Sequence, residues 1–418
     1  MLWANLLHIY QPPFQKRKII DKVVRESYGR ILFVLEALPK VKISLNICAS
    51  LTEQLLKCGH QKILNRIKRL ANRGQIELVG SAKYHPILPF LPKSEVIRQV
   101  KLNEALNQKC FGEIWRPRPK GFFLPELAYD QKTAKIIQNL GYEWIVLDEI
   151  AYQGRFGRVL FDRSYEIKGL FPNQEKKKLK VIFRNRGLSL LFFGQWLDSL
   201  SPVQNSSDQL GQASFPKDRG MDKFFSAIKK DKRSDRFLVT SFDGENLGHH
   251  HKYLIEIWRE ILNQPGIQTV TYSEYLKFLP TRPVIEVEPL ISTWSTEVKD
   301  LKEDIPYPLW RHPRNQVHQW QWRLTDTLLR IMKSCQKDAN YKKARNLFDR
   351  ALASDQYWWA SANPWWSPGI IKRGTRDFVQ ISQLLEKSLN PGSKNRVIKI
   401  ARDIFNELER RKSLEKIK

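Results

Sequence analysis

Cysteine is scarce in this sequence. The 418 residues include four cysteines, and none of them forms a Cys-x-x-Cys pair or a zinc-ribbon spacing. They are Cys48, Cys58, Cys110 and Cys335. Small secreted proteins that depend on disulfides carry many regularly spaced cysteines. The sequence therefore predicts neither a disulfide framework nor a structural zinc site, and we expect a reducing, cytoplasmic environment.

Long apolar runs are also absent. No stretch approaches the roughly 18 consecutive apolar residues of a membrane-spanning helix, so no membrane partner is expected. The first ten residues are apolar, but no basic segment and no small-residue cleavage site accompany them. We therefore expect a buried first strand there rather than a signal peptide. Hydrophobic residues still make up 42% of the chain, which is enough for a large packed core.

Acidic residues are few compared with basic ones. The chain has 43 Asp and Glu against 71 Lys and Arg, which gives a formal net charge of +28. Such an excess is compatible with binding to nucleic acid or to an acidic polymer. The basic residues are spread along the whole chain, however, and no recognition helix or RNA-binding signature is present. The charge is therefore a weak guide to function, and we expect no specific nucleic-acid partner.

Short apolar runs alternate with longer amphipathic segments through the first 270 residues. The predicted strands are Leu2–Ile9, Ile43–Ile47, Ile76–Val79, Gly121–Leu124, Trp144–Leu147, Val181–Arg184, Leu188–Phe193, Phe237–Phe242 and Ile267–Val270. The predicted helices among them are Asp21–Leu38, Leu51–Ala71, Lys93–Gln108, Gln131–Leu140, Met221–Lys230 and His249–Leu262. About seven of these strands are of the helix-linked kind, so the alternation predicts an α/β fold with parallel strands and crossover helices.

Beyond Pro280 the strand pattern fades. Helical periodicity predicts four segments there, which are Gln316–Lys333, Tyr341–Ala353, Arg376–Leu389 and Arg396–Ile417. Earlier in the chain, Ser199–Ser214 is rich in Ser, Gln and Asp and predicts a long loop. We therefore expect a β/α barrel domain over residues 1–285, with a loop insertion near 199–220, and a mainly helical subdomain over residues 286–418.

Polar residues follow several of the predicted strands. Glu126 comes directly after the apolar run Gly121–Pro125, and Asp243 and Glu245 follow the buried strand that ends at Phe242. In a parallel β/α barrel the carboxyl ends of the strands meet at one rim, where reactive residues lie. Two carboxylates that flank one bond are the minimum equipment for glycoside hydrolysis, one as acid and one as nucleophile. The pair Glu126 and Asp243 fits this chemistry, although a single glutamate after a strand is more often a salt-bridge partner.

Ordered blocks of the chain resemble glycoside hydrolase family 57 over about residues 1–290. The blocks are Leu7–Pro13, Gly74–Gly80 with Tyr84–Pro89, Gly121–Tyr129 and Asp243–His249, and the segments Gly141–Asp148 and Phe183–Ser189 are similar as well. A fifth block matches only loosely, around Ile291–Trp294. The resemblance implies a distorted seven-stranded (β/α) barrel followed by a C-terminal helical bundle that helps to close the cleft.

The resemblance also implies roles for individual residues. Glu126 stands where the family has its nucleophile, and Asp243 stands where it has its general acid/base. Phe123 and His250 stand where many members have a tryptophan, and we expect both to bind substrate. The other residues that correspond to substrate contacts are His8, Gln11, Glu77, His85 and Glu245. The aromatic segments Tyr357–Trp359 and Pro364–Trp366 are then expected to line the cleft from the helical side.

The reaction that the resemblance implies is retaining cleavage of α-1,4 linkages in α-glucans of the starch or glycogen type. It passes through a covalent glycosyl-enzyme and requires carboxyl groups about 5 to 5.5 Å apart, against about 6.5 to 9.5 Å in an inverting enzyme. α-Amylase, 4-α-glucanotransferase and branching activities all stay open, because the sequence does not show whether water or a sugar hydroxyl is the acceptor. No cofactor and no metal ion are expected, and the oligomeric state is left open.

Three alternatives belong to other classes of function. A catalytically silent carbohydrate-binding barrel is disfavoured by the presence of both Glu126 and Asp243. A metal-dependent polysaccharide deacetylase needs paired Asp residues with His-x-x-x-His ligands, a pattern that the sequence lacks. The run His249–His251 does not replace it, because consecutive residues of a helix point in different directions. Charge-driven binding of nucleic acid is compatible with catalysis and would weaken steeply with salt.

Overall fold

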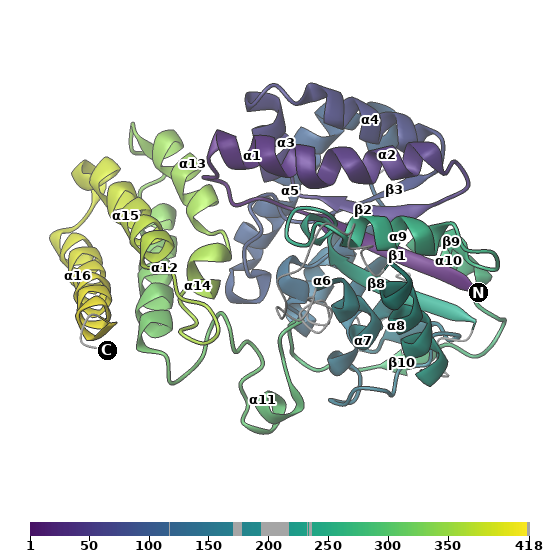
Figure 1. Ribbon diagram of the computed structural model, residues 1–418. Helices are drawn as coiled ribbons and strands as arrows, with labels where there is room; N and C mark the ends of the chain where they lie inside the picture. Colours follow the sequence, from purple (N-terminus) through teal and green to yellow (C-terminus); the bar gives the residue numbers. More distant parts are fainter. Residues whose placement is uncertain (117, 170–177, 194–216, 232, 234–235, 416–418) are drawn as a thin grey trace, which may run out of the picture.

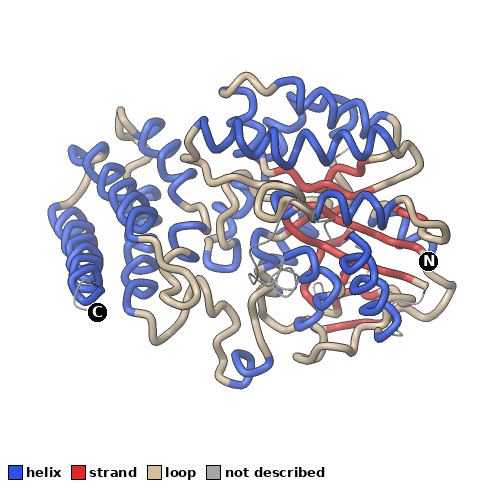
Figure 2. The backbone as a smooth tube through the Cα atoms, viewed as in Figure 1, coloured by secondary structure: helices blue, strands red, loops and turns tan. Residues whose placement is uncertain are grey.

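Strands with their covering helices form one end of the molecule, and a helical region forms the other (Figure 1). The computed structural model describes residues 1–116, 118–169, 178–193, 217–231, 233 and 236–415. The predicted loop Ser199–Ser214 lies outside the described residues. Figure 2 shows the strands gathered beneath helices at the end that holds the N-terminus.

The strands of the described residues lie in two five-stranded sheets. The first has the order β3-β2-β1-β8, with β9 also paired to β1; its strands are β1 Leu2–Ile9, β2 Ile43–Ile47, β3 Ile76–Val79, β8 Phe237–Asp243 and β9 Gln268–Val270. The second has the order β10-β6-β7-β5-β4; its strands are β4 Gly121–Phe123, β5 Trp144–Asp148, β6 Tyr165–Ile167, β7 Lys180–Arg184 and β10 Ile285–Val287. All pairings are parallel except that of β6 with β7.

The two sheets close into a barrel of seven parallel strands. At one seam Gly80, directly after β3, pairs with Phe122 of β4, and the Phe123 amide donates to the Gly80 carbonyl over 2.8 Å. At the other seam the Asn185 amide, directly after β7, donates to the Val239 carbonyl of β8 over 2.8 Å. The ring runs β1, β2, β3, β4, β5, β7 and β8, which confirms the predicted barrel. β6 and β10 extend the second sheet beyond β7, and β9 pairs with Leu2–Ala4 of β1, before the stretch Leu6–Ile9 that pairs with β2.

Helices cover the outside of the strands (Figure 1). They are α1 Arg17–Val23, α2 Gly29–Ala37, α3 Ala49–Lys57, α4 Gln61–Asn72, α5 Lys93–Phe111, α6 Gln131–Asn139, α7 Arg186–Leu190, α8 Lys217–Lys230, α9 Leu254–Leu262 and α10 Tyr272–Phe278. Trp3 and Leu7 of β1 pack beneath them in one core cluster with Leu35 of α2. Ala4 and Leu6 belong to another cluster, because successive side chains of a strand point to opposite faces. Both faces of β1 are therefore buried, as parallel barrel strands require.

A helical region follows the strands and faces their carboxyl ends. The N-terminus marks the far end of β1, and β1 runs from it toward these helices (Figure 1). The helices are the short α11 Val298–Lys302, then α12 Gln316–Ser334, α13 Tyr341–Ala351, α14 Asp355–Trp358, α15 Pro368–Leu384 and α16 Pro391–Glu415. The Tyr10 hydroxyl, just beyond β1, donates to Oδ2 of Asp355 over 2.6 Å. Since β10 ends at Val287, we propose that the boundary between the two regions lies directly after it, close to the expected residue 285.

Two predicted elements differ from the structure in type or in number. Leu188–Phe193 is not a strand, because Arg186–Leu190 forms α7 and a 3-10 turn follows over Leu191–Phe193. The Asn185 side chain caps this helix by accepting a hydrogen bond from the Leu188 amide over 3.0 Å. Phe192 then stacks on Phe242 of β8 with ring centroids 4.2 Å apart, so the apolar run serves helix packing.

The second correction concerns Leu51–Ala71, which was predicted as one helix. It is divided into α3 and α4 at Gly59, whose φ of +83° suits glycine and ends the first helix. The hydrophobic periodicity continues across Gly59, so the periodicity does not indicate the break between the two helices. Among the described residues, no helix combines the length and the apolar character that crossing a membrane requires.

Candidate active site

Three polar side chains share one layer at the carboxyl ends of neighbouring strands. In the strand register His8 of β1 lies opposite Asn46 of β2 on one side and opposite Asp243 of β8 on the other. Residues that are paired across parallel strands have side chains on the same face of the sheet. The barrel therefore brings these groups together although they are far apart in the sequence.

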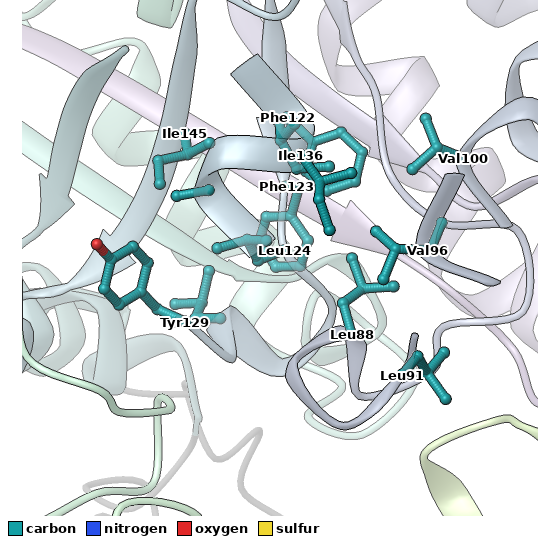
Figure 3. Packing of buried hydrophobic residues seen from close by; sticks show 14 of the residues in the cluster. Leu88, Leu91, Val96, Val100, Phe122, Phe123, Leu124, Tyr129, Ile136 and Ile145 are labelled. Atoms are coloured by element: carbon teal, nitrogen blue, oxygen red, sulfur yellow. The ribbon is translucent and has the colours of Figure 1, made fainter. Parts of the chain in front are cut away.

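Glu126 reaches the same mouth from a strained turn after β4. Its φ of +60° places a non-glycine residue in the left-handed region, which costs about 1 to 2 kcal/mol. Figure 3 shows the buried apolar packing around this turn, which includes Phe122, Phe123, Leu124, Leu88, Val96, Ile136 and Ile145. The Trp294 amide also donates to the Glu126 carbonyl over 3.2 Å. Packing and this hydrogen bond hold the turn, and such strain is typical of functional sites.

The carboxylate of Glu126 is held on both oxygens. Its Oε1 accepts from the Ser354 hydroxyl over 2.8 Å, and its Oε2 accepts from the Trp294 indole over 2.8 Å. His85 Nδ1 lies 3.4 Å from Oε1. Burial alone raises the pKa of Glu126, but the hydrogen bond and charge of His85, together with the bonds from Trp294 and Ser354, bring the pKa below its ordinary value. Glu126 is therefore an ionised, oriented carboxylate.

The pKa of Asp243 moves in the opposite direction. Burial, and next the negative charge of Glu126, raise the pKa of Asp243 to about 6. Geometry brings the two groups to one mouth, because His8 pairs with Asp243 in the strand register and stacks on His85, which lies 3.4 Å from Glu126. One group is thus kept ionised while the other tends to hold a proton, which is the division of labour between a nucleophile and a general acid.

Glu245 lies beside this pair, directly after β8. Its Oε1 accepts from the Tyr10 amide over 3.0 Å, from the Tyr28 hydroxyl, and more weakly from Gln11 Nε2 at 3.5 Å. Burial, and next the charge of Asp243, raise the pKa of Glu245 to about 8. Because the donors converge on Oε1, the proton of the neutral form belongs on Oε2, where it can be donated to a ligand.

Aromatic rings build the floor of the site. His8 stacks on Phe123 with ring centroids 4.5 Å apart and on His85 at 4.9 Å, and Tyr10 stacks on His85 at 4.4 Å. His8 Nδ1 lies 2.7 Å from Oδ1 of Asn46, whose amide group donates to backbone carbonyls, so Nδ1 carries the hydrogen of this bond. Burial, and next the charge of His85, lower the pKa of His8 to about 3. His8 is therefore neutral, with Nε2 as an acceptor.

The comparison with protein families decides the assignment. A model described as Glycosyl hydrolase family 57 matches residues 8–288, which is more than half of the chain. The chain belongs to glycosyl hydrolase family 57. This confirms the resemblance seen in the sequence, and the matched range contains both strand-end carboxylates, Glu126 and Asp243.

Proteins with several different enzyme names are similar to the chain. An α-amylase from Pyrococcus horikoshii is 23% identical over 428 residues, which cover 91% of this chain and 59% of that protein. A 4-α-glucanotransferase from Thermococcus litoralis is 24% identical over 320 residues, which cover 71% of this chain and 42% of that protein. The chain thus spans only part of the length of these relatives.

A solved structure shows the same fold over nearly the whole chain. The family 57-type branching enzyme from Pyrococcus horikoshii superposes with a TM-score of 0.71 at 16% sequence identity, and the match covers 96% of this chain and 94% of that one. The helical region after the barrel is therefore shared with this protein.

Most residues that the family 57 resemblance singled out lie in this cluster, but two do not. Glu77 points into the barrel two residues before the layer of His8, and its carboxylate accepts from the hydroxyls of Ser44 and Ser273. His250 is exposed in the turn before α9, where its amide donates to the Glu245 carbonyl over 3.0 Å. Because α9 begins only at Leu254, the predicted helix start at His249 was wrong, and the histidine run lies in a turn.

Several members of the cluster were not named as site residues from the sequence. They are Tyr10, Tyr28, Asn46, Trp294, Ser354 and Asp355. The sequence did offer signals, because Tyr10 and Trp294 lie in the first and fifth blocks, and Ser354 and Asp355 lie shortly before the aromatic segment Tyr357–Trp359 that was expected at the cleft. Trp358, Trp359 and Trp365 do form one ring cluster, with centroids 5.1 to 5.6 Å apart.

Proposed function

We propose that the protein is a retaining glycoside hydrolase or transglycosylase that acts on α-glucans, with Glu126 as nucleophile and Asp243 as general acid/base. The observation that carries the proposal is the meeting of two strand-end carboxyl groups at one barrel mouth, Glu126 held by Ser354 and Trp294 and Asp243 in the layer of His8. Their pKa values are displaced in opposite directions, downward for Glu126 and upward, to about 6, for Asp243. A double displacement needs this pairing of an ionised and a protonated carboxyl group.

In the first step Asp243 gives its proton to the glycosidic oxygen while Glu126 attacks the anomeric carbon. The bond from that carbon to the leaving oxygen breaks, and an ester bond to Glu126 forms. In the second step the Asp243 carboxylate takes a proton from the acceptor hydroxyl, whose oxygen displaces Glu126 and restores its carboxylate. Net retention at the anomeric carbon follows.

Neighbouring groups are suited to hold the sugar that is being cleaved. Nε2 of neutral His8 can accept a hydrogen bond from a sugar hydroxyl, and Oε2 of protonated Glu245 can donate one. Ser354 and Trp294 hold the two oxygens of Glu126 and so fix the direction of attack. Glu77 and His250 are not proposed as sugar contacts, because the Glu77 carboxylate is bonded to Ser44 and Ser273 inside the barrel, and His250 is exposed and meets Glu245 through its backbone amide.

The substrate class is proposed from the names of the family members, which include α-amylase, 4-α-glucanotransferase and 1,4-α-glucan branching enzyme. Each of these activities cleaves or transfers α-glucan chains and needs the same first step. Water or a sugar hydroxyl then takes the glycosyl group from Glu126. Which of the two this protein uses is decided by the products it forms. We also propose a cytoplasmic location, as expected from the scattered cysteines.

The test incubates the purified protein with maltoheptaose and follows the products by chromatography, in parallel with Glu126→Ala and Asp243→Asn. A ladder of longer and shorter oligomers is the result expected of a transferase, and short products alone are the result expected of a hydrolase. Added azide should form a glycosyl azide with Glu126→Ala, because a small anion can replace the missing nucleophile. A wild type as inert as both variants would contradict the proposal.

A further inference from the structure

A constellation of three potential metal ligands lies within the same barrel mouth, and one of them, Cys48, takes no part in the proposed reaction. His8, Cys48 and His85 are all buried, and one potential metal-ligand atom of each lies within 4.8 Å of the other two. Cys48 directly follows β2, and the two histidines come from the end of β1 and from the segment after β3. The three segments are separate in the sequence, so no spacing motif signals the group.

Each imidazole has one nitrogen occupied and the other available. His8 uses Nδ1 toward Oδ1 of Asn46 at 2.7 Å, and His85 uses Nδ1 toward the Ser354 hydroxyl at 3.1 Å and Glu126 Oε1 at 3.4 Å. Metal-bound histidines in proteins almost always donate their second ring N–H to a carboxylate or carbonyl oxygen in this way. The outer partners that orient a metal-binding imidazole are therefore in place for both rings.

The second ring nitrogen of His85 is an unpartnered buried atom in the described part of the chain. His85 is 3% exposed, and its Nε2 has no hydrogen-bond partner among the described residues. Buried polar atoms normally have a partner, so an orphaned acceptor or donor calls for a ligand. The Cys48 sulfur lies 3.9 Å from Oδ1 of Asn46 and is hydrogen-bonded with the Ser81 side chain, and because sulfur is a weak hydrogen-bonding atom a metal ion could replace both contacts.

The chemistry of the three donors selects a metal class. One thiolate with two imidazoles is a donor set for zinc and similar borderline ions, and three protein ligands leave a fourth position open. In a tetrahedral zinc site such atoms lie about 3.4 to 3.6 Å apart, given bonds of about 2.0 to 2.3 Å. The present separations of up to 4.8 Å must therefore shorten when the ion binds.

We propose that His8, Cys48 and His85 bind a zinc-class divalent ion at the floor of the cleft, and that the bound ion blocks saccharide from reaching His8 and His85. Burial raises the pKa of the Cys48 thiol, so the free protein holds the thiol form. Binding then transfers the thiol proton to solvent as the sulfur–metal bond forms, without any change of oxidation state. The blocking of saccharide rests on the proposed function, whereas the binding of the ion does not.

The direct test uses Co²⁺ as a spectroscopic probe on the full chain. Wild type and Cys58→Ser should both develop a thiolate-to-cobalt charge-transfer band, because Cys58 lies outside the constellation. Cys48→Ser and Cys48→Ala should lose the band while keeping the circular dichroism of the wild type. Absence of the band in folded wild type, or its persistence in either folded Cys48 variant, would overturn the proposal.

A second measurement tests the consequence for activity. Zn²⁺ should inhibit maltoheptaose turnover by wild type and Cys58→Ser, and a chelator should restore it. Relative to its own zinc-free rate, Cys48→Ser should need at least about tenfold more Zn²⁺ for the same inhibition, as expected for the loss of one of three ligands. Equal inhibition of the Cys48 and Cys58 variants would overturn the blocking role. If the protein has no activity on glucans, the cobalt band still decides whether the ion binds.

Discussion

The barrel side and the helical side of the candidate site contribute different groups. The barrel side provides the reacting groups, Glu126 after β4 and Asp243 at the end of β8, together with the stacked rings of the floor. The helical side provides Ser354 and Asp355, which hold Glu126 and Tyr10 of the barrel side. The chemistry thus lies at strand ends, while its positioning depends on chain that comes some 230 residues later. This difference predicts graded effects of substitution.

The largest effect should come from the barrel side, at Glu126. We expect Glu126→Gln to lower kcat roughly 10⁴-fold or more, because no covalent intermediate can form. Stopped assays with maltoheptaose measure the loss, and circular dichroism checks the fold. Retention of even a tenth of the activity would show that another group attacks the sugar.

Substitution of Asp243 should have the next largest effect on rate, and it should also change the pH dependence of kcat/KM. Its acid form is present below about pH 6 and is lost as the pH rises through that value, so kcat/KM of the wild type should fall on the basic side with a midpoint near 6. Asp243→Asn should lose this limb and about 10² to 10⁴ in rate. The loss should be smaller on an aryl α-glucoside with an acidic phenol, which needs no protonation to leave. An unchanged basic limb in Asp243→Asn would exclude this residue as the acid.

On the helical side, Ser354→Ala should cost roughly tenfold in kcat, the value of one hydrogen bond to a charged group. Without that bond the pKa of Glu126 should rise, because the Ser354 hydroxyl helps to hold it down. Glu126 must be ionised to attack, so the acid limb of the pH profile should move to higher pH. Ser393→Ala, on the distant α16, is the control and should match the wild type. A drop in kcat without any shift of the limb would mean that Ser354 acts only on the fold.

The smallest effect should come from removing the hydrogen bond between Tyr10 of the barrel side and Asp355 of the helical side. Tyr10→Phe keeps the ring that stacks on His85 but removes the hydroxyl that donates to Asp355. We expect about 1 to 2 kcal/mol less stability in urea unfolding and a loss of activity of roughly threefold. If the loss exceeded that of Ser354→Ala, Asp355 would have to take part in the chemistry, and the division between the two sides would break down.

The same division explains what could be predicted from the sequence. Strands such as β1, β2 and β3 were placed correctly because both their faces are buried and their apolar runs are short and bounded. Glu126 and Asp243 were found because each directly follows such a strand. A short apolar run does not distinguish strand from helix by itself, and Leu188–Phe193 was misassigned for this reason.

The positioning residues escaped prediction for a different reason. Ser354 and Tyr28 are ordinary residues of helical segments, and only tertiary contact brings their hydroxyls to Glu126 and Glu245. Glu77 sits in a sequence block that matches the family well, yet its carboxylate is bonded inside the barrel. A matching block of sequence therefore locates a strand reliably. What a side chain contacts depends on which face of the strand it lies on and on how far along the barrel it lies.

The most direct measurement is to trap the glycosyl-enzyme. Wild type would be treated with a fluorinated glucosyl fluoride, whose electron-poor ring slows the second step, and the digested protein would be analysed by mass spectrometry. We expect one added sugar, as an ester on the peptide that contains Glu126, and no label in Glu126→Gln. A label on any other residue, or turnover with inversion and no trapped sugar, would contradict the assignment of Glu126 as the nucleophile.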